Sequence, residues 1–284
     1  MLALRSCGPV RVPAENAGSG RGARRAKKRK AGSKACIKAE IEGINIKIEI
    51  KSEMTTREKL IIALDVPTTD DARRLIAKIG DAGAFYKIGY QLMPIGGIEL
   101  ARELGEAGKK IFLDFKFHDI GATVERGVRS VARLGGDYLT VHAEPDVLKG
   151  AVAGRGDDAR LKILAVTVLT SLSQASLARC GIDMKLEDLV LKRAEFAAEA
   201  GADGVIASAR EARAIRARFG AALSIVTPGV RPAGAAHDDQ KRVVTPADAI
   251  RAGADRLVVG RPVIAAADPA QAARAIQTEI AAAS

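Results

Sequence analysis

The chain has 284 residues, and an excess of 45 Lys and Arg over 34 Asp and Glu gives it a formal charge of +11. Its three cysteines are odd in number and widely spaced, which argues against a disulfide framework or a zinc site and favours a reducing cytosol. No apolar run approaches the roughly 18 residues that span a bilayer, and the N-terminus lacks a secretory signal, so we expect a cytoplasmic protein.

The positive charge is concentrated at the N-terminus. Residues 1–54 carry 13 Lys and Arg against 5 Glu, a net of +8, which leaves +3 for the other 230 residues. Residues 1–53 are predicted to be a disordered basic extension, or a misassigned start if translation begins at Met54. The basic run 24–30 is also compatible with a nuclear signal or an RNA-binding tail, and the acid-poor composition with a transit peptide. The nearly balanced remainder does not indicate nucleic-acid binding.

From residue 54 to residue 284, apolar runs of strand length alternate with segments of helical periodicity. Eight strands are predicted, at 59–66, 85–89, 110–116, 137–143, 162–170, 204–208, 224–230 and 256–263. Amphipathic helices are predicted between them, among others at 70–80, 97–108, 122–136, 186–201 and 246–254. Eight β–α units predict a single-domain (β/α)8 TIM barrel, with an open doubly wound sheet as the alternative.

Polar residues stand at the ends of most predicted strands, where TIM barrels carry their active sites. In order they are Asp65, Lys87, Asp114, Lys116, His142, Thr170, Arg231, Gly260 and Arg261. Along the strand 110–116, Phe112, Asp114 and Lys116 share one face, while Leu113 and Phe115 share the other. The second face can pack against helices, which leaves the charged residues at the barrel mouth.

Asp114 and Lys116, with Lys87 from the neighbouring strand and Asp119 from the following loop, form a cluster of two carboxylates and two ammonium groups. A lysine flanked by carboxylates stays protonated, because opposite charges favour its charged form. The cluster therefore predicts a reaction in which an acid is directed at a developing carbanion. An ion pair on an ordinary barrel rim is the alternative interpretation.

The loops after the last two strands predict a phosphate site, as TIM barrels commonly have there. They supply Arg231, Gln240, Gly260 and Arg261. Arginine suits bidentate phosphate contact, and glycine lets a backbone N–H approach the phosphate closely. Any one of these arginines taken alone would more often be a surface residue.

The motifs, in this order, resemble the bacterial orotidine 5′-phosphate decarboxylase family over residues 58–280. The matching segments are LIIALDV, YKIG, FLDFKFHDIGATV, LTVHA, AVTVLTS, TPGVRP, DDQKRVVTPADAI and LVVGRPV. The resemblance implies a homodimeric barrel that converts orotidine 5′-phosphate to uridine 5′-phosphate (UMP) and carbon dioxide, the last step of pyrimidine nucleotide synthesis. It also implies that no metal or organic cofactor takes part. Residues 1–53 have no counterpart in the family.

The same resemblance implies a role for each candidate residue. Lys116 is expected to protonate C6 of the pyrimidine, and Asp114 to face the substrate carboxylate. Lys87 would complete the charge network near the ribose. The other expected substrate ligands are Asp65 for a ribose hydroxyl, Thr170 beside the pyrimidine, Asp119 and Thr123 reaching into the partner subunit's site, and Arg231, Gln240, Gly260 and Arg261 around the phosphate.

Two alternatives remain open from the sequence. A sugar-phosphate enzyme of the same superfamily resembles the motif around Lys116 but uses magnesium, whereas the segment 169–171 and the region of Gln240 favour the nucleotide substrate. A basic-tailed RNA-binding or scaffolding protein with a catalytically idle barrel is the second. His118 and His142 are interpreted as hydrogen-bonded structural groups, because no third ligand stands at a suitable spacing for a metal.

Overall fold

The computed structural model describes residues 36–41, 44–49, 54–232 and 244–284, and the chain divides into two compact units, Met1–Glu53 and Met54–Ser284. In the first unit, strand β1 (Cys36–Ile41) pairs antiparallel with β2 (Ile44–Glu49). These strands were not predicted, although both alternate apolar with polar residues, which is the period-two pattern of a strand. Disorder was predicted for all of residues 1–53; within them β1 and β2 are strands, and the remainder, with the basic run 24–30, lies outside the described residues.

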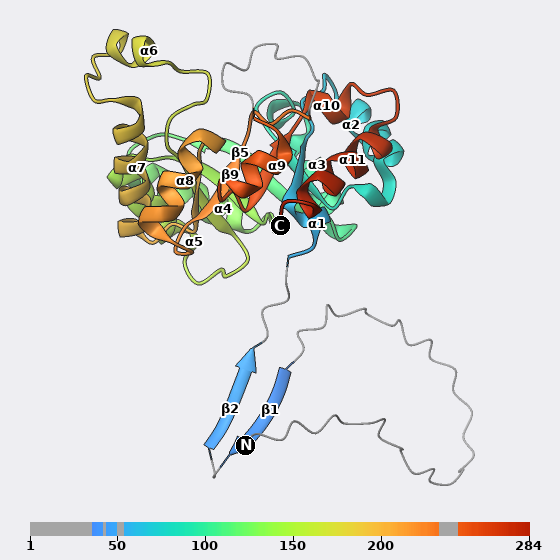
Figure 1. Ribbon diagram of the computed structural model, residues 1–284, viewed down its shortest axis with the longest axis horizontal. Helices are drawn as coiled ribbons and strands as arrows, with labels where there is room; N and C mark the ends of the chain where they lie inside the picture. The colour runs from blue at the N-terminus through green and yellow to red at the C-terminus, as the bar shows by residue number, and fades with distance from the viewer. Residues whose placement is uncertain (1–35, 42–43, 50–53, 233–243) are drawn as a thin grey trace. The chain divides into compact units, whose positions relative to one another are not determined.

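In the second unit, eight parallel strands form a closed barrel (Figure 1). They are β3 (Leu60–Ala63), β4 (Phe85–Ile88), β5 (Lys110–Phe117), β6 (Tyr138–His142), β7 (Lys162–Val166), β8 (Gly204–Ile206), β9 (Ser224–Thr227) and β10 (Arg256–Val259). Each strand pairs with the next along the chain, and β10 closes the barrel by pairing with β3, Val258 opposite Ile61. The predicted TIM barrel is confirmed, and the doubly wound sheet is wrong.

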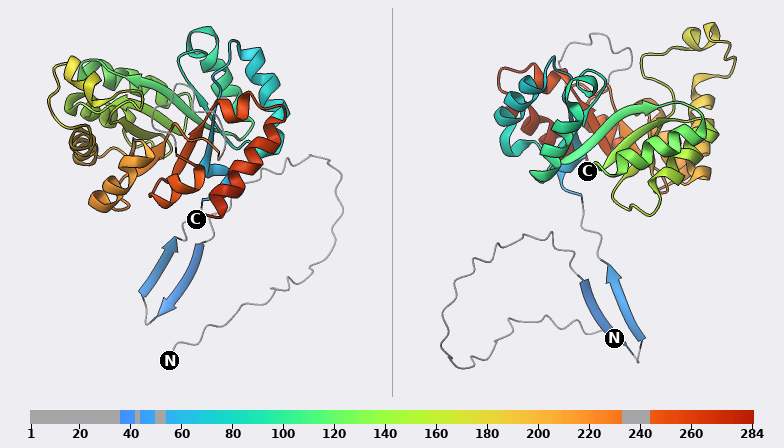
Figure 2. Two further views of the ribbon diagram at one scale, coloured as in Figure 1. Left: turned by 45° about the horizontal axis from the view of Figure 1, so that its top comes forward. Right: turned by 180° about the vertical axis from the view of Figure 1, so that it is seen from behind.

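Helices follow the strands and surround the barrel (Figure 2). They are α1 (Thr56–Lys59), α2 (Thr69–Ile79), α3 (Gly97–Glu106), α4 (Gly121–Ala132), α5 (Pro145–Arg155), α6 (Gln174–Arg179), α7 (Leu186–Ala200), α8 (Ala209–Phe219), α9 (Pro246–Arg251), α10 (Arg261–Ile264) and α11 (Pro269–Ala281). The five helices named from the sequence are all present, as α2, α3, α4, α7 and α9. Among the described helices, none is both long and apolar enough to cross a membrane.

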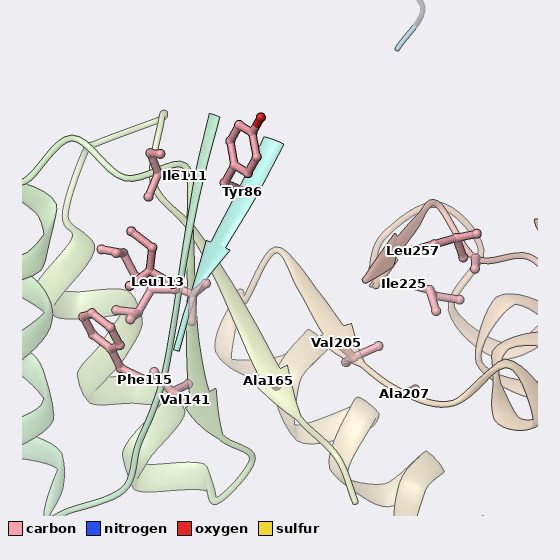
Figure 3. Close-up of a cluster of buried hydrophobic side chains, with 14 of the residues drawn as sticks. Tyr86, Ile111, Leu113, Phe115, Val141, Ala165, Val205, Ala207, Ile225 and Leu257 are labelled. Atoms are coloured by element: carbon pink, nitrogen blue, oxygen red, sulfur yellow. The ribbon is translucent and has the colours of Figure 1, made fainter. Parts of the chain in front are cut away.

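Two sets of buried apolar side chains form the core. The larger set lies between the strands and the helices, and includes Leu113 and Phe115 of β5 (Figure 3). The smaller set fills the barrel interior and includes Phe112 of the same strand. This alternation confirms the predicted division of β5 into two faces and leaves Asp114 on the interior side.

Three loops that end in aspartate anchor the amino-terminal end of the barrel. In each, the carboxylate accepts the backbone N–H of the second residue of the preceding strand and forms an ion pair with an arginine. The hydrogen bonds join Ile111 to Asp137 at 2.8 Å, Ile163 to Asp203 at 2.9 Å and Ile225 to Asp255 at 2.7 Å. The arginines are Arg160, Arg155 and Arg216. These contacts join β5 to β6, β7 to β8 and β9 to β10.

Helices α4 and α5 approach each other closely through glycine. A Cβ atom added at Gly150 would lie 2.2 Å from the carbonyl oxygen of Gly121, and one at Gly154 would lie 2.3 Å from that of Glu125. No side chain fits at either position without displacement of the backbone. This contact fixes the start of α4, and with it the loop that follows β5.

A chain that starts at Met54 is expected to keep the melting temperature of the full-length chain, because all eight barrel strands and the described core residues lie within 54–284. Circular dichroism melts of the two proteins should agree within about 2 °C, which corresponds to less than about 1 kcal/mol. A drop of many degrees in the shortened chain would contradict this and would assign residues 1–53 a part in barrel stability.

Candidate active site

A cavity of about 460 Å³ opens at the carboxyl-terminal ends of the barrel strands. The sequence-predicted residues that line it are Asp65, Lys87, Asp114, Lys116, Thr170, Arg231, Gly260 and Arg261. These residues come from positions up to 196 residues apart in the sequence, and the barrel brings them around one space because all its strands run in the same direction.

Four of these residues form a continuous chain of alternating charges. Lys87 Nζ lies 3.2 Å from Asp65 Oδ1 and 3.3 Å from Asp114 Oδ2, and Lys116 Nζ lies 2.7 Å from Asp114 Oδ1. Asp114 therefore faces a different ammonium group with each of its two oxygens. The side chains of Lys87 and Asp114 are only 10% and 14% exposed, so water screens these contacts little.

Burial and charge act in opposite directions on the central pair. Burial raises the pKa of Asp114, but Lys87 and Lys116 outweigh it and hold that pKa below its ordinary value. Burial likewise lowers the pKa of Lys87, but Asp114 and Asp65 outweigh it and hold that pKa above the ordinary range. Asp114 thus remains ionised and Lys87 protonated at neutral pH, as predicted for a lysine flanked by carboxylates.

The backbone of β5 leaves regular strand geometry around Asp114 and Lys116. The register between β5 and β6 shifts between Leu113 and Phe117, and Lys116 has a φ of 44°. Its backbone N–H donates to Thr140 Oγ1 at 3.0 Å, and the Thr140 hydroxyl donates to Asp114 Oδ1 at 2.9 Å. Tyr90 also reaches this segment, donating its hydroxyl to the Phe115 carbonyl at 3.0 Å.

Two parts of this arrangement were not predicted from the sequence. Thr140 and Tyr90 were not candidates, since a threonine within a predicted strand and a tyrosine after one carry no signal of their own. Apolar residues also line the cavity, and only Leu169 among them lies in a segment that the sequence linked to the substrate. They are Ala63, Phe112, Val166, Val168, Leu169, Ile206, Val258 and Ile264. This apolar wall lowers the local polarity and so strengthens the charge interactions beside it.

The predicted phosphate ligands follow strands β9 and β10. In the barrel, these two strands lie on the side away from β5. Arg231 is buried, with 6% exposure, and the backbone beside it is fixed by a bridge between Val230 and Val244. Gly260 precedes α10, and a Cβ there would lie 3.7 Å from Asp65 Oδ2. Arg261 is the first residue of α10 and is exposed. Gln240 lies outside the described residues.

Most of the predicted strands are longer than the observed ones, and two of them extend four residues too far. The strand expected to end at Thr170 ends at Val166, and the one expected to reach residue 263 ends at Val259. Thr170 therefore lies in the connection that leads to α6, a segment that extends away from the barrel (Figures 1 and 2), and Arg261 lies in a helix. Both residues nevertheless line the cavity.

Asp119 and Thr123 do not line this chain's own cavity, and the second carboxylate of the charge chain is Asp65, not Asp119 as the sequence predicted. Asp119 is exposed, and its carboxylate accepts the Ile120 N–H at 2.6 Å. Thr123 lies in the first turn of α4, as the sequence predicted, and accepts a long hydrogen bond from Arg126 at 3.4 Å. Between them, Ile120 is 71% exposed, which is unusual for a large apolar side chain.

His118 and His142 stack on each other, with ring centroids 4.7 Å apart, and His118 Nε2 lies 3.6 Å from Glu144 Oε2. Burial lowers the pKa of His142. Among the described residues, no group of three or more His, Cys, Asp or Glu side chains could hold a metal ion. The two histidines therefore form a packed pair beside the charged residues.

Comparison with known proteins covers the barrel and all the lining residues above. The family model described as "Orotidine 5'-phosphate decarboxylase / HUMPS family" matches residues 58–276. The chain belongs to this family. It is 56% identical to an orotidine 5′-phosphate decarboxylase of Methylobacterium sp. (strain 4-46) over 230 residues, which are 80% of this chain and 98% of the relative. It is 55% identical to one of Rhodopseudomonas palustris (strain BisB5), over 81% of this chain and 98% of the relative.

A solved structure agrees. The crystal structure of orotidine 5′-phosphate decarboxylase from Lactobacillus acidophilus matches with a TM-score of 0.70 at 37% identity, over 78% of this chain and 98% of that one. The family inferred from the sequence motifs is thus confirmed, and the chain is an enzyme of the carboxy-lyase class.

Replacing Lys87 by methionine is expected to raise the pKa of Asp114, because the charge of Lys87 is one of the causes that hold this pKa low. A carboxylate whose pKa is lowered by folding stabilises the fold above its ordinary pKa of about 3.9, and this contribution is lost as the pH falls through the folded-state value. The wild type should therefore lose more unfolding free energy on acidification than Lys87→Met does.

Urea unfolding at about pH 7 and about pH 3.5 measures the difference. Lys149→Met is the control, since Lys149 is exposed on α5. Equal losses in the wild type and Lys87→Met would show that Lys87 does not set the Asp114 pKa.

Proposed function

We propose that this chain decarboxylates orotidine 5′-phosphate to UMP and carbon dioxide without a metal or organic cofactor, with Lys116 as the proton donor to C6. The observation that carries the proposal is the charge chain that ends at Lys116 in an apolar cavity, with Arg231 and Arg261 lining the same cavity. The names of the relatives point to the same substrate.

The difficulty of the reaction explains why fixed charges are needed. When the bond between C6 and the carboxylate breaks, its electron pair stays in an orbital in the plane of the pyrimidine, where the ring carbonyls cannot delocalise it. An ammonium group placed at C6 stabilises this pair and then transfers a proton to it. In the proposed mechanism Lys116 carries out this step, which its contact with Asp114 supports, and it regains its proton from water after the product leaves.

Asp114 contributes through its charge. Its pKa is held low by Lys87 and Lys116, so it is ionised when the anionic substrate carboxylate binds beside it. The two carboxylates repel each other in the bound state, and the repulsion ends when carbon dioxide leaves. Lys87 keeps Asp114 charged and in place through its contact with Oδ2.

The distant parts of the substrate supply the binding energy. In the proposed complex Arg231, Gly260, Arg261 and Gln240 hold the phosphate, Asp65 binds a ribose hydroxyl, and Thr170 lies beside the pyrimidine. Asp65 is the most exposed member of the charge chain, with 53% of its side chain accessible, which suits a ligand contact. Binding energy from these contacts keeps the reacting carbon against Lys116.

The active enzyme is proposed to be a homodimer in which Asp119 and Thr123 complete the partner's site. Both residues lie outside their own cavity, and Asp119 is exposed in a loop beside the 71% exposed Ile120. Burial of this isoleucine against a second copy would remove a large apolar surface from water. The proposal accounts for an exposed carboxylate that stands close in sequence to Asp114 and Lys116 but outside their cavity.

A magnesium-dependent sugar-phosphate enzyme fits the cavity less well. Magnesium is bound through carboxylate oxygens, and here both oxygens of Asp114 face ammonium groups. The relatives described above are named for the nucleotide substrate. An RNA-binding or scaffolding function would depend on the basic tail, whose run 24–30 lies outside the described residues.

The reaction is tested by the change in ultraviolet absorbance of orotidine 5′-phosphate with purified protein and excess EDTA. We expect turnover unaffected by EDTA, and a loss of at least about 10³-fold in kcat for Lys116→Ala, because the variant lacks both the acid and its charge. Lys192→Ala, at an exposed lysine of α7, is the control and should retain full activity. Turnover that EDTA abolishes would favour the magnesium enzyme.

The shared site is tested by mixing two inactive variants, Lys116→Ala and Asp119→Ala. A mixed dimer contains one site with both native residues and one with neither. Random exchange of subunits should therefore restore about one quarter of wild-type activity, as expected for a two-fold dimer. If Asp119 served its own subunit's site, every site in the mixture would lack one residue and activity would stay absent.

A further inference from the structure

Thr140 is a buried residue in contact with Asp114 and Lys116, the two charged residues near the carboxyl-terminal end of β5. It lies in the middle of β6, its exposure is 0%, and it is not among the residues that line the cavity. Its single hydroxyl accepts the backbone N–H of Lys116 at 3.0 Å and donates to Asp114 Oδ1 at 2.9 Å. The hydroxyl is the only hydrogen-bonding group of a threonine side chain, so both contacts depend on Thr140 Oγ1.

The backbone of Lys116 needs this support. Within the described ranges, Lys116 is the only residue other than glycine with a positive φ, at 44°. Such a conformation costs about 1–3 kcal/mol and persists only where surrounding contacts impose it. The register shift between β5 and β6 occurs at the same place, and the Thr140 hydroxyl provides an acceptor for the Lys116 N–H there.

The same hydroxyl also orients the Asp114 carboxylate. Oδ1 receives Thr140 at 2.9 Å and Lys116 Nζ at 2.7 Å, while Oδ2 faces Lys87 Nζ at 3.3 Å. The three donors come from β6, β5 and β4, respectively. The carboxylate cannot rotate without losing at least one of these three contacts. Thr140 therefore fixes both ends of the pair: the backbone of the lysine and the side chain of the aspartate.

We infer that Thr140 is a positioning residue, whose hydroxyl ties Lys116 and Asp114 to β6 and so sets where the proton donor stands relative to the carboxylate. This inference rests on the proposed decarboxylation. Displacement of a reacting group by about 1 Å can cost about 10²-fold in rate, so loss of the hydroxyl affects chemistry more than binding. The phosphate and ribose ligands lie on other loops and are untouched.

Thr227 provides a matched control. It lies in β9 of the same barrel, it is also 0% exposed, and its Oγ1 has no hydrogen-bond partner among the described residues. Thr227→Val therefore removes a buried barrel hydroxyl with no contact to Lys116 or Asp114. Any general effect of this substitution on a barrel strand appears in both variants.

The test compares Thr140→Val, Thr140→Ser and Thr227→Val with the wild type. We expect Thr140→Val to lower kcat by about 10- to 100-fold, with KM changed less than about threefold, because positioning and not binding is lost. Thr140→Ser retains the hydroxyl and should recover most of kcat. Thr227→Val should match the wild type. Wild-type kcat in Thr140→Val, or no recovery in Thr140→Ser, would overturn the inference.

A second measurement does not depend on turnover. The pKa of Asp114, followed by carbon-13 NMR of its carboxyl group and assigned with Asp114→Asn, should rise in Thr140→Val, because the carboxylate loses a donor. It should stay constant in Thr227→Val, and an unchanged value in Thr140→Val would overturn the inference.

Failure of the proposed function would appear differently: the wild type would show no turnover, but the Asp114 pKa would still rise in Thr140→Val. If Thr140→Val does not fold, Thr140→Cys, with a weaker donor, replaces it; there, wild-type kcat would again overturn the inference.

Discussion

The position of the Asp114 carboxylate between Lys87 and Lys116 is the constraint on which the site depends. A buried carboxylate or ammonium alone is costly, and removal of one partner from such a pair typically costs about 3–5 kcal/mol. Here each charge is balanced by its neighbours, which come from β4, β5 and the loop after β3. The arrangement exists only when those strands are correctly aligned, so the charges can be in place only when the barrel has formed around them.

The amino-terminal and carboxyl-terminal ends of the barrel strands have different roles. At the amino-terminal end, Asp137 accepts the Ile111 N–H, and equivalent aspartates anchor β7 and β9. At the carboxyl-terminal end, β5 departs from regular pairing and carries the charged residues into the cavity. The regular end supplies stability that the irregular end does not, which is the usual division between the two faces of a TIM barrel.

The sequence predicted the barrel well because its signals are local. Period-two alternation placed Asp114 and Lys116 opposite Leu113 and Phe115, and eight apolar runs gave eight strands. Strand ends were less predictable: Val168 and Leu169 continue the apolar run beyond Val166 although the strand has ended, and periodicity does not distinguish cavity lining from strand. Thr140 could not be found, since threonine is common in strands and its contacts depend on a register shift that only the folded barrel defines.

The strained backbone at Lys116 connects stability to the proposed chemistry. Regular strand pairing through residues 114–116 would avoid the positive φ at Lys116 and would also place Asp114 and Lys116 on one face. In the irregular turn that the structure has instead, Lys116 Nζ lies 2.7 Å from Asp114, and hydrogen bonds with Thr140 and Tyr90 fix the backbone on either side. Stabilisation of a carbanion by fixed charges requires that the charges do not relax when the electron pair appears. A proton donor whose backbone is fixed meets this requirement better than one held only by its flexible side chain. The strain at Lys116 destabilises the barrel, and the aspartate contacts at the other end of the strands offset it.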